Sequence, residues 1–237
     1  MISIMTSFRT FRFTFLFAFL VFCNSCKNET QKATEPSSEK IQSWENSAAV
    51  KDSVKNILFY GNSLTAGYGL DSDEAFPALI QQKLDSLNLD YKVINAGLSG
   101  ETTAGGLGRL DWILKQPVSI FILELGANDG LRGVPLDETR KNLQSIIDKV
   151  RQKDPETNII LAGMQLPPNI GREYTAEFKE IYPSLAEKND LYLIPFLLED
   201  VAGKPDLNQG DGIHPTAEGQ KIVARNVWEI LREVISE

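Results

Sequence analysis

The segment Ile57-Leu58-Phe59-Tyr60-Gly61-Asn62-Ser63-Leu64-Thr65 governs the architecture expected of this chain. Its first four residues are apolar and favour a β-strand, and the Gly-Asn-Ser turn that follows is predicted to end that strand. In α/β folds, functional sites lie at the carboxyl ends of parallel strands. The segment therefore predicts a buried first strand that presents the Ser63 hydroxyl at this edge of a sheet.

Strands and helices are predicted to alternate along the rest of the chain. Four further β-favouring runs predict strands at residues 91–95, 118–125, 158–163 and 191–194. Apolar residues at helical spacing predict helices that begin near residues 75, 102, 136, 174 and 216. Alternation without repeats predicts a single three-layer α/β/α domain over residues 54–237, with a five-stranded parallel sheet between two layers of helices.

Small and polar residues follow the first three predicted strands. They form the segments Gly61-Asn62-Ser63, Ala96-Gly97 and Gly126-Ala127-Asn128-Asp129. Because all strands of a parallel sheet end on one edge, these loops are expected to meet there. The segment from Asp211 to His214 precedes the last helix and can join them. We expect one site to form from these four loops.

The residues of these loops suit acyl transfer. A serine hydroxyl needs a base during attack, and histidine is the side chain whose reference pKa lies near neutrality. His214 is the only histidine in the chain, and Asp211 stands three residues before it, placed to hold the second ring nitrogen. Plainer explanations exist for each residue alone: Ser63 as a helix cap, and His214 as a capping or surface residue.

An oxyanion formed during acyl transfer needs hydrogen-bond donors. The backbone N–H groups of Ser63 and Gly97 and the side-chain amide of Asn128 are three candidates. A glycine at position 97 is expected because the backbone must approach a ligand closely. The plainer alternatives are an ordinary loop glycine at position 97 and a simple turn at Asn128-Asp129-Gly130.

Composition narrows the range of partners. The formal net charge is −8, and the first 26 residues contribute only two arginines, which leaves 22 basic and 32 acidic residues for the remainder. Such an acidic chain argues against nucleic acid as a partner. With one histidine and no cysteine after Cys26, neither a metal site nor a disulfide is expected. We expect a monomer that needs no cofactor and acts on a small neutral or zwitterionic molecule.

The N-terminus has the order of a secretory signal. Arg9 and Arg12 precede the apolar run 13–22, which is about half of the roughly 20 residues that a membrane-spanning helix needs. Ser25-Cys26-Lys27 resembles a bacterial lipoprotein cleavage site, which makes residues 1–26 a lipoprotein-type signal peptide and Cys26 the lipidated residue. A signal removed whole, or a short permanent anchor, is the alternative.

Residues 27–53 are polar and charged, without apolar periodicity. A segment of this composition cannot bury a core, so it is predicted to be a disordered tether. Together with Cys26 it predicts an exported protein that is lipid-anchored to the bacterial envelope, in the periplasm or on the cell surface. The lipid anchor would then be the protein's only contact with a membrane.

The four loops also resemble, in order, the sequence blocks of the SGNH (GDSL-like) hydrolases. The intervening segments 128–133, 166–169 and 181–183 are similar to the bacterial multifunctional acyl thioesterase/lysophospholipase/arylesterase branch, over a region from about Asn56 to the C-terminus. The resemblance implies a flavodoxin-like fold, a Ser63–Asp211–His214 triad and an oxyanion hole formed by Ser63, Gly97 and Asn128.

The resemblance also implies where a substrate would bind. A flexible loop at 130–135, including Gly130 and Leu131, would shape an acyl pocket, and the loop that begins with Leu166 and Pro167 is a second candidate wall or a plain surface loop. One departure is Asn62, where the family usually has aspartate. Asparagine keeps an acceptor oxygen and loses the charge, so we expect this residue to adjust the level of activity rather than to abolish it.

These features predict a serine esterase that forms an acyl-enzyme and acts on aryl esters, lysophospholipids, other acyl esters or thioesters. An α/β-hydrolase is disfavoured because its Gly-x-Ser-x-Gly elbow would need glycine where Thr65 stands. A carbohydrate O-acetylesterase on the same scaffold stays open. A non-catalytic lipid- or glycan-binding surface lipoprotein is the other alternative, although a pure binder has no need of His214.

The lipoprotein prediction is testable by metabolic labelling. Palmitate should label the wild-type protein and fail to label Cys26→Ala, because the thiol of Cys26 is the predicted attachment point. Cys23→Ala is the matched control and should retain the label. Equal labelling of wild type and Cys26→Ala would contradict the prediction.

Overall fold

The sheet that the segment 57–65 predicts is present and has five parallel strands in the order β2-β1-β3-β4-β5. The computed structural model describes residues 55–236. The predicted signal peptide, Cys26 and the predicted tether lie outside the described residues. The strands are β1 (Lys55–Gly61), β2 (Tyr91–Asn95), β3 (Ile120–Glu124), β4 (Asn158–Ala162) and β5 (Tyr192–Ile194).

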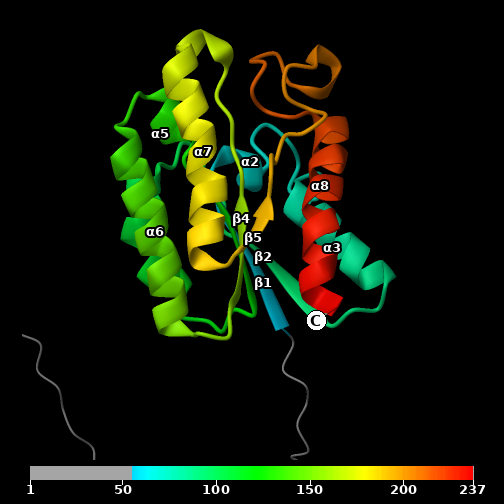
Figure 1. Cartoon of the computed structure of the whole chain (residues 1–237). Coiled ribbons are helices and arrows are strands. Elements are labelled where there is room, and N and C mark those ends of the chain that lie inside the picture. Colours follow the sequence, from blue (N-terminus) through cyan, green and yellow to red (C-terminus); the bar gives the residue numbers. More distant parts are fainter. Residues whose placement is uncertain (1–54, 237) are drawn as a thin grey trace, which may run out of the picture. The chain divides into compact units, whose positions relative to one another are not determined.

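Five long helices cover the two faces of the sheet (Figure 1). On one face lie α3 (Phe76–Ser86) and α8 (Ala217–Ser236), and on the other lie α4 (Thr103–Ile113), α6 (Leu136–Lys153) and α7 (Arg172–Asn189). The predicted three-layer α/β/α architecture is therefore confirmed. The strand order is that of flavodoxin-like folds. No helix within residues 55–236 is long and apolar enough to cross a membrane.

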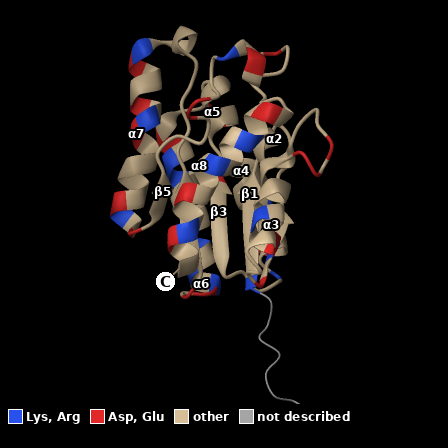
Figure 2. Cartoon of the chain, turned by 90° about the vertical axis from the view of Figure 1, so that its right-hand side faces the viewer, with Lys and Arg blue, Asp and Glu red and all other residues tan. Residues whose placement is uncertain are grey.

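Burial explains why the central strands are apolar along their whole length. All five residues of β3 are buried, as expected for a parallel strand with helices on both faces. Charged side chains lie mainly on the helices and connecting loops, and the strands are mostly uncharged (Figure 2). Glu124, the last residue of β3, is an exception: it is only 1% exposed.

Short helical segments gather at the carboxyl edge of the sheet. These are α2 (Ser63–Ala66), α5 (Ala127–Leu131), the 3₁₀ turn Pro168–Ile170 and the 3₁₀ turn Pro205–Leu207. The segment expected as a loop from residue 130 begins instead as the last turn of α5. Asp129 explains this difference, because its buried carboxylate accepts hydrogen bonds from the backbone N–H and hydroxyl of Thr103 and so fixes α5 against α4.

Candidate active site

The end of β1 leads directly into the turn that carries Ser63. Asn62 caps α2, since its side-chain oxygen accepts the Leu64 N–H at 2.9 Å, and Ser63 is the first helical residue. The cap explanation considered for Ser63 therefore applies to Asn62 instead. As the first residue of a helix, Ser63 has a backbone N–H without an intrahelical acceptor.

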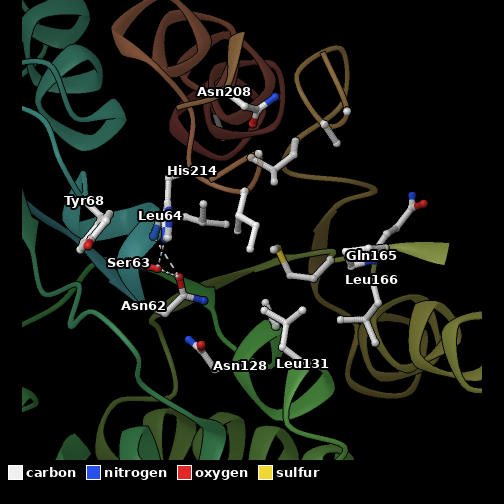
Figure 3. Close-up of a pocket in the computed structure, with 18 of the residues that line it drawn as sticks. Asn62, Ser63, Leu64, Tyr68, Asn128, Leu131, Gln165, Leu166, Asn208 and His214 are labelled. Atoms are coloured by element: carbon white, nitrogen blue, oxygen red, sulfur yellow. Dashed lines mark hydrogen bonds between the residues drawn. The ribbon is translucent and has the colours of Figure 1, made fainter. Parts of the chain in front are cut away.

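Ser63, His214 and Asp211 lie in one hydrogen-bonded row (Figure 3 shows Ser63 beside His214). The Ser63 hydroxyl lies 2.9 Å from His214 Nε2, and His214 Nδ1 lies 2.7 Å from Asp211 Oδ2. The other carboxylate oxygen, Asp211 Oδ1, accepts the backbone N–H groups of Ile213 at 2.8 Å and His214 at 3.0 Å. These contacts fix the imidazole ring between a carboxylate and a hydroxyl.

The charge of Asp211 is stabilised by these hydrogen bonds. The backbone N–H of His214, its side chain and the backbone N–H of Ile213 lower the pKa of Asp211 to about 2. A carboxyl group with a lowered pKa stays ionised at all pH values above that range. Asp211 is therefore an anion wherever the fold is expected to operate, and an acidic decline of activity near neutral pH must come from another group.

One face of the His214 ring is covered by Tyr68. The two ring centroids lie 4.6 Å apart with planes tilted by 38°. Gln209 holds the backbone at this point, because its side-chain amide donates to the Tyr68 carbonyl at 2.7 Å. The aromatic contact restricts rotation of the imidazole, and sequence reasoning did not single out Tyr68.

Asn128 faces the same space from α5. Its amide nitrogen donates one hydrogen bond to the Glu101 carbonyl at 3.0 Å, which leaves the second N–H of that amide for another acceptor. Glu101 is itself held by a salt bridge to Arg109, and Arg109 also donates to the Ala96 carbonyl at 2.7 Å. Arg109 thus holds the loop after β2 at both ends, and Glu101 of that loop orients Asn128.

Gly97 follows β2 and packs against the backbone of α2. Its N–H donates to the Asn95 side chain at 3.0 Å, and a Cβ at this position would lie 2.3 Å from the backbone nitrogen of Ala66. Position 97 therefore requires glycine because the backbone of α2 packs against it, a reason that the sequence alone did not indicate. Whether its N–H also serves an oxyanion stays a prediction.

A cleft of about 580 Å³ opens beside Ser63 and His214 (Figure 3). Volumes of this size are typical of sites for small molecules. Its lining is mainly apolar, with a few polar groups next to the row described above. The lining residues are Asn62, Ser63, Leu64, Tyr68, Ser99, Gly100, Ala127, Asn128, Leu131, Met164, Gln165, Leu166, Pro167, Pro168, Phe196, Leu198, Ala202, Gly203, Asn208, Gly212, Ile213 and His214.

Three of the four residues expected to contact substrate line this cleft. Leu131, Leu166 and Pro167 belong to its lining, whereas Gly130 does not: it lies buried within α5. Gly130 cannot bear a side chain there because a Cβ would lie 2.6 Å from a methyl group of Leu166. Gly130 thus lets Leu166, which does line the cleft, pack closely against α5, and a direct contact of Gly130 with substrate stays a prediction.

A buried carboxyl group lies behind the nucleophile turn. Glu124 accepts the Asn62 amide at 2.6 Å, the Asn62 backbone N–H at 3.0 Å and the Thr65 hydroxyl at 2.8 Å. Burial raises the pKa of Glu124 to about 7, although these hydrogen bonds act to lower it. Sequence reasoning missed this residue; the available signal was a single acid at the end of an otherwise apolar strand.

No arrangement of His, Cys, Asp and Glu side chains suitable for a metal ion occurs among residues 55–236. The site described above presents a serine hydroxyl, an imidazole, a carboxylate and amide donors. These are the components of nucleophilic acyl transfer.

Comparison with known proteins supports this interpretation. Residues 59–222 match the GDSL-like Lipase/Acylhydrolase family. The chain is 41% identical over 169 residues to thioesterase 1/protease 1/lysophospholipase L1 of Escherichia coli strain K12, covering 71% of this chain and 79% of that protein. It is 39% identical over 185 residues to an arylesterase of Vibrio mimicus, covering 78% of this chain and 92% of that protein.

A solved structure agrees with the sequence relatives. The psychrotrophic esterase EstA from Pseudoalteromonas sp., solved inhibited by monoethylphosphonate, superposes with a TM-score of 0.73 at 34% identity and covers 77% of this chain and 100% of that chain. The fold, the motifs and the extent of the match agree with one another. This chain belongs to the GDSL-like lipase/acylhydrolase family of SGNH hydrolases.

Proposed function

We propose that this protein is a serine esterase that hydrolyses carboxylic esters with an apolar acyl group through an acyl-enzyme on Ser63. The observation that carries the proposal is the row formed by Asp211, His214 and Ser63, which ends at the mouth of the apolar cleft. The relatives' names, which include esterase, arylesterase, thioesterase and lysophospholipase, support ester hydrolysis.

In the proposed mechanism, His214 Nε2 takes the proton of the Ser63 hydroxyl as its oxygen attacks the ester carbonyl. Asp211, an anion held by backbone N–H groups, stabilises the imidazolium that forms. His214 then protonates the leaving alcohol, and the acyl group remains on Ser63. A water molecule, deprotonated by the same imidazole, hydrolyses this acyl-enzyme and restores the serine.

We assign oxyanion stabilisation to the Ser63 N–H and to the free N–H of the Asn128 amide. Both residues line the cleft, and both groups have a hydrogen to donate. Gly97 is the third proposed donor. Its N–H donates to the Asn95 side chain at 3.0 Å, so it would have to share that hydrogen with the oxyanion.

The lining of the cleft favours an acyl chain over a sugar. Leu131, Met164, Leu166, Phe196 and Ile213 supply an apolar surface on which methylene groups can be buried. A carbohydrate O-acetylesterase would need polar groups for sugar hydroxyls beside a small acetyl pocket, so this alternative is the weaker one. The intact row of Ser63, His214 and Asp211 argues against a non-catalytic binder.

An exported enzyme would not meet acyl-coenzyme A. The predicted N-terminal signal and the predicted lipid on Cys26 therefore support lysophospholipids, other acyl esters or aryl esters as the natural substrates, and the envelope as the proposed location. A membrane contact through the lipid anchor and a monomeric state belong to the same proposal.

The mechanism predicts that Ser63→Ala and His214→Ala each remove nearly all hydrolysis of p-nitrophenyl butyrate, because nucleophile and base act as one unit. The residual rate should still exceed water by about 10³-fold through oxyanion binding alone. Ser145→Ala, on the far helix α6, is the matched control and should retain wild-type kcat. Substantial turnover by Ser63→Ala would refute the proposed nucleophile.

Asn128→Ala should lower kcat by about 10²- to 10³-fold with little change in KM, because the lost donor acts mainly in the transition state. Steady-state kinetics at saturating ester gives the measurement. Asn142→Ala, which removes an amide that donates to Thr103 at 3.1 Å, controls for loss of support around α5. Wild-type turnover by Asn128→Ala would exclude Asn128 from the oxyanion hole.

The apolar cleft predicts that kcat/KM for p-nitrophenyl butyrate exceeds that for the acetate by about tenfold, because two additional buried methylenes contribute about 1.6 kcal/mol. The measurement is a panel of p-nitrophenyl esters from acetate to palmitate beside acetylated xylan. Leu166→Ala should reduce the butyrate preference and leave the acetate rate nearly unchanged. Product release from acetylated xylan alone would establish the carbohydrate esterase instead.

A further inference from the structure

The carboxyl group of Glu124 contacts the turn that carries Ser63, but the mechanism proposed above assigns it no role. Glu124 ends β3 next to Gly61 of β1, and its side chain is 1% exposed. A buried carboxyl group without full hydrogen bonding is strongly destabilising, so its presence in an apolar strand calls for a specific use. Its partners are all on the turn that carries Ser63.

The donors around Glu124 are arranged for a carboxylate. Its Oε1 accepts the Asn62 amide, and its Oε2 accepts both the Asn62 backbone N–H and the Thr65 hydroxyl. Gly61 leaves the room for this arrangement, since a Cβ there would lie 2.5 Å from Glu124 Oε2 and 2.1 Å from the Thr65 hydroxyl oxygen. The glycine, asparagine and threonine around Ser63 thus all accommodate one carboxyl group.

Glu124 determines which way the Asn62 amide faces. With its nitrogen held by Glu124, Asn62 directs its oxygen to the Leu64 N–H at 2.9 Å, and this oxygen lies 3.4 Å from the Ser63 hydroxyl. A reversed amide would place a second donor against the Leu64 N–H and would leave Ser63 beside an N–H group. The orientation of Asn62 therefore links Glu124 to the capped helix on which Ser63 stands.

We propose that Glu124 is a positioning residue of this esterase, which in its ionised form holds Asn62 and Thr65 and thereby fixes Ser63 against His214. The inference rests on Ser63 being the nucleophile, as proposed above. A protonated Glu124 would bring an O–H among these donors, so that the Thr65 hydroxyl would have to accept instead of donate or an N–H of Asn62 would lose its acceptor. Activity should then decline when this carboxyl group takes up a proton.

The surroundings place that protonation in the neutral range. Burial raises the pKa of Glu124 to about 7. Tyr182 of α7 is the neighbouring titratable group, and its pKa is raised by burial and by the charges of Glu124 and Asp129, so it stays neutral. Its hydroxyl donates to the Leu125 carbonyl at 3.0 Å rather than to Glu124. Because an acid with a raised pKa loses its charge as pH falls, the positioning effect is complete above that pKa and is lost below it.

A reciprocal exchange of the two side chains tests the proposal. In Glu124→Gln, either orientation of the new amide puts an N–H against an N–H of Asn62: against its side-chain amide, which must then turn, or against its backbone N–H. We expect kcat for p-nitrophenyl butyrate to fall by about 10- to 100-fold with KM within about twofold, because the nucleophile is misplaced while the cleft is intact. The double variant N62D/E124Q restores an acceptor opposite the new amide and should recover to within about threefold of wild-type kcat.

Thr65→Val gives a second readout that does not depend on how well Glu124→Gln folds. It removes one hydrogen bond that stabilises the carboxylate of Glu124, so this group should take up its proton at a pH about half a unit higher. Protonation of the general base His214 contributes to the same acid limb of the kcat/KM profile. Because the Thr65 hydroxyl donates to Glu124, a shift of that limb to higher pH in Thr65→Val reports Glu124. Thr157→Val is the matched control: it removes a buried hydroxyl that donates to the Val118 carbonyl at 2.7 Å, before β4, and should leave both kcat and the acid limb unchanged.

Each outcome separates this inference from the esterase assignment. Wild-type kcat in Glu124→Gln, no recovery in N62D/E124Q, or an unmoved acid limb in Thr65→Val would overturn the role of Glu124. In those cases an inactive Ser63→Ala would still uphold the esterase. Full activity in Ser63→Ala would remove both conclusions together.

Discussion

All five strands of the sheet run the same way, and this constraint brings the site together. Because β1, β2 and β3 end on one edge, the loops that carry Ser63, Gly97 and Asn128 become neighbours although they are distant in sequence. The segment that carries Asp211 and His214 enters the same edge before α8 and places His214 Nε2 at 2.9 Å from the Ser63 hydroxyl. Buried apolar strands thus supply the rigid base on which a polar, partly open site is built.

Two carboxyl groups on either side of Ser63 experience opposite environments. Asp211 is solvent-exposed and surrounded by N–H groups, which lower its pKa to about 2. Glu124 also accepts several hydrogen bonds, but burial outweighs them and raises its pKa to about 7. The comparison shows that hydrogen bonds alone do not set the charge of a carboxyl group, because the cost of desolvation competes with them. The site therefore contains one permanent anion and one that titrates in the neutral range.

Sequence patterns revealed the features that depend on local spacing. The sequence alone indicated the alternation of strands and helices, the turn at Ser63 and the three-residue separation of Asp211 from His214. Features that depend on packing were not indicated. In the sequence Glu124 is a single acid in an apolar strand, and only the structure shows that Gly61, Asn62 and Thr65 surround it. The structure likewise shows that the glycines at 97 and 130 leave room for Ala66 and Leu166. Tyr68 was likewise missed because its contact with His214 joins residues far apart in sequence.

The contacts of Arg109 bear on how the substrate specificity of such an enzyme can change during evolution. Arg109 binds the Ala96 carbonyl and the carboxylate of Glu101 and so braces the loop after β2, while the Glu101 carbonyl accepts the Asn128 amide and connects this loop to α5. Another part of the lining, with Phe196 and Leu198, belongs to the segment after β5, which is not among the hydrogen-bond partners of Arg109. Substitutions in that part of the lining can reshape the space for an acyl chain while the catalytic geometry is inherited intact, so new specificities are accessible in single steps.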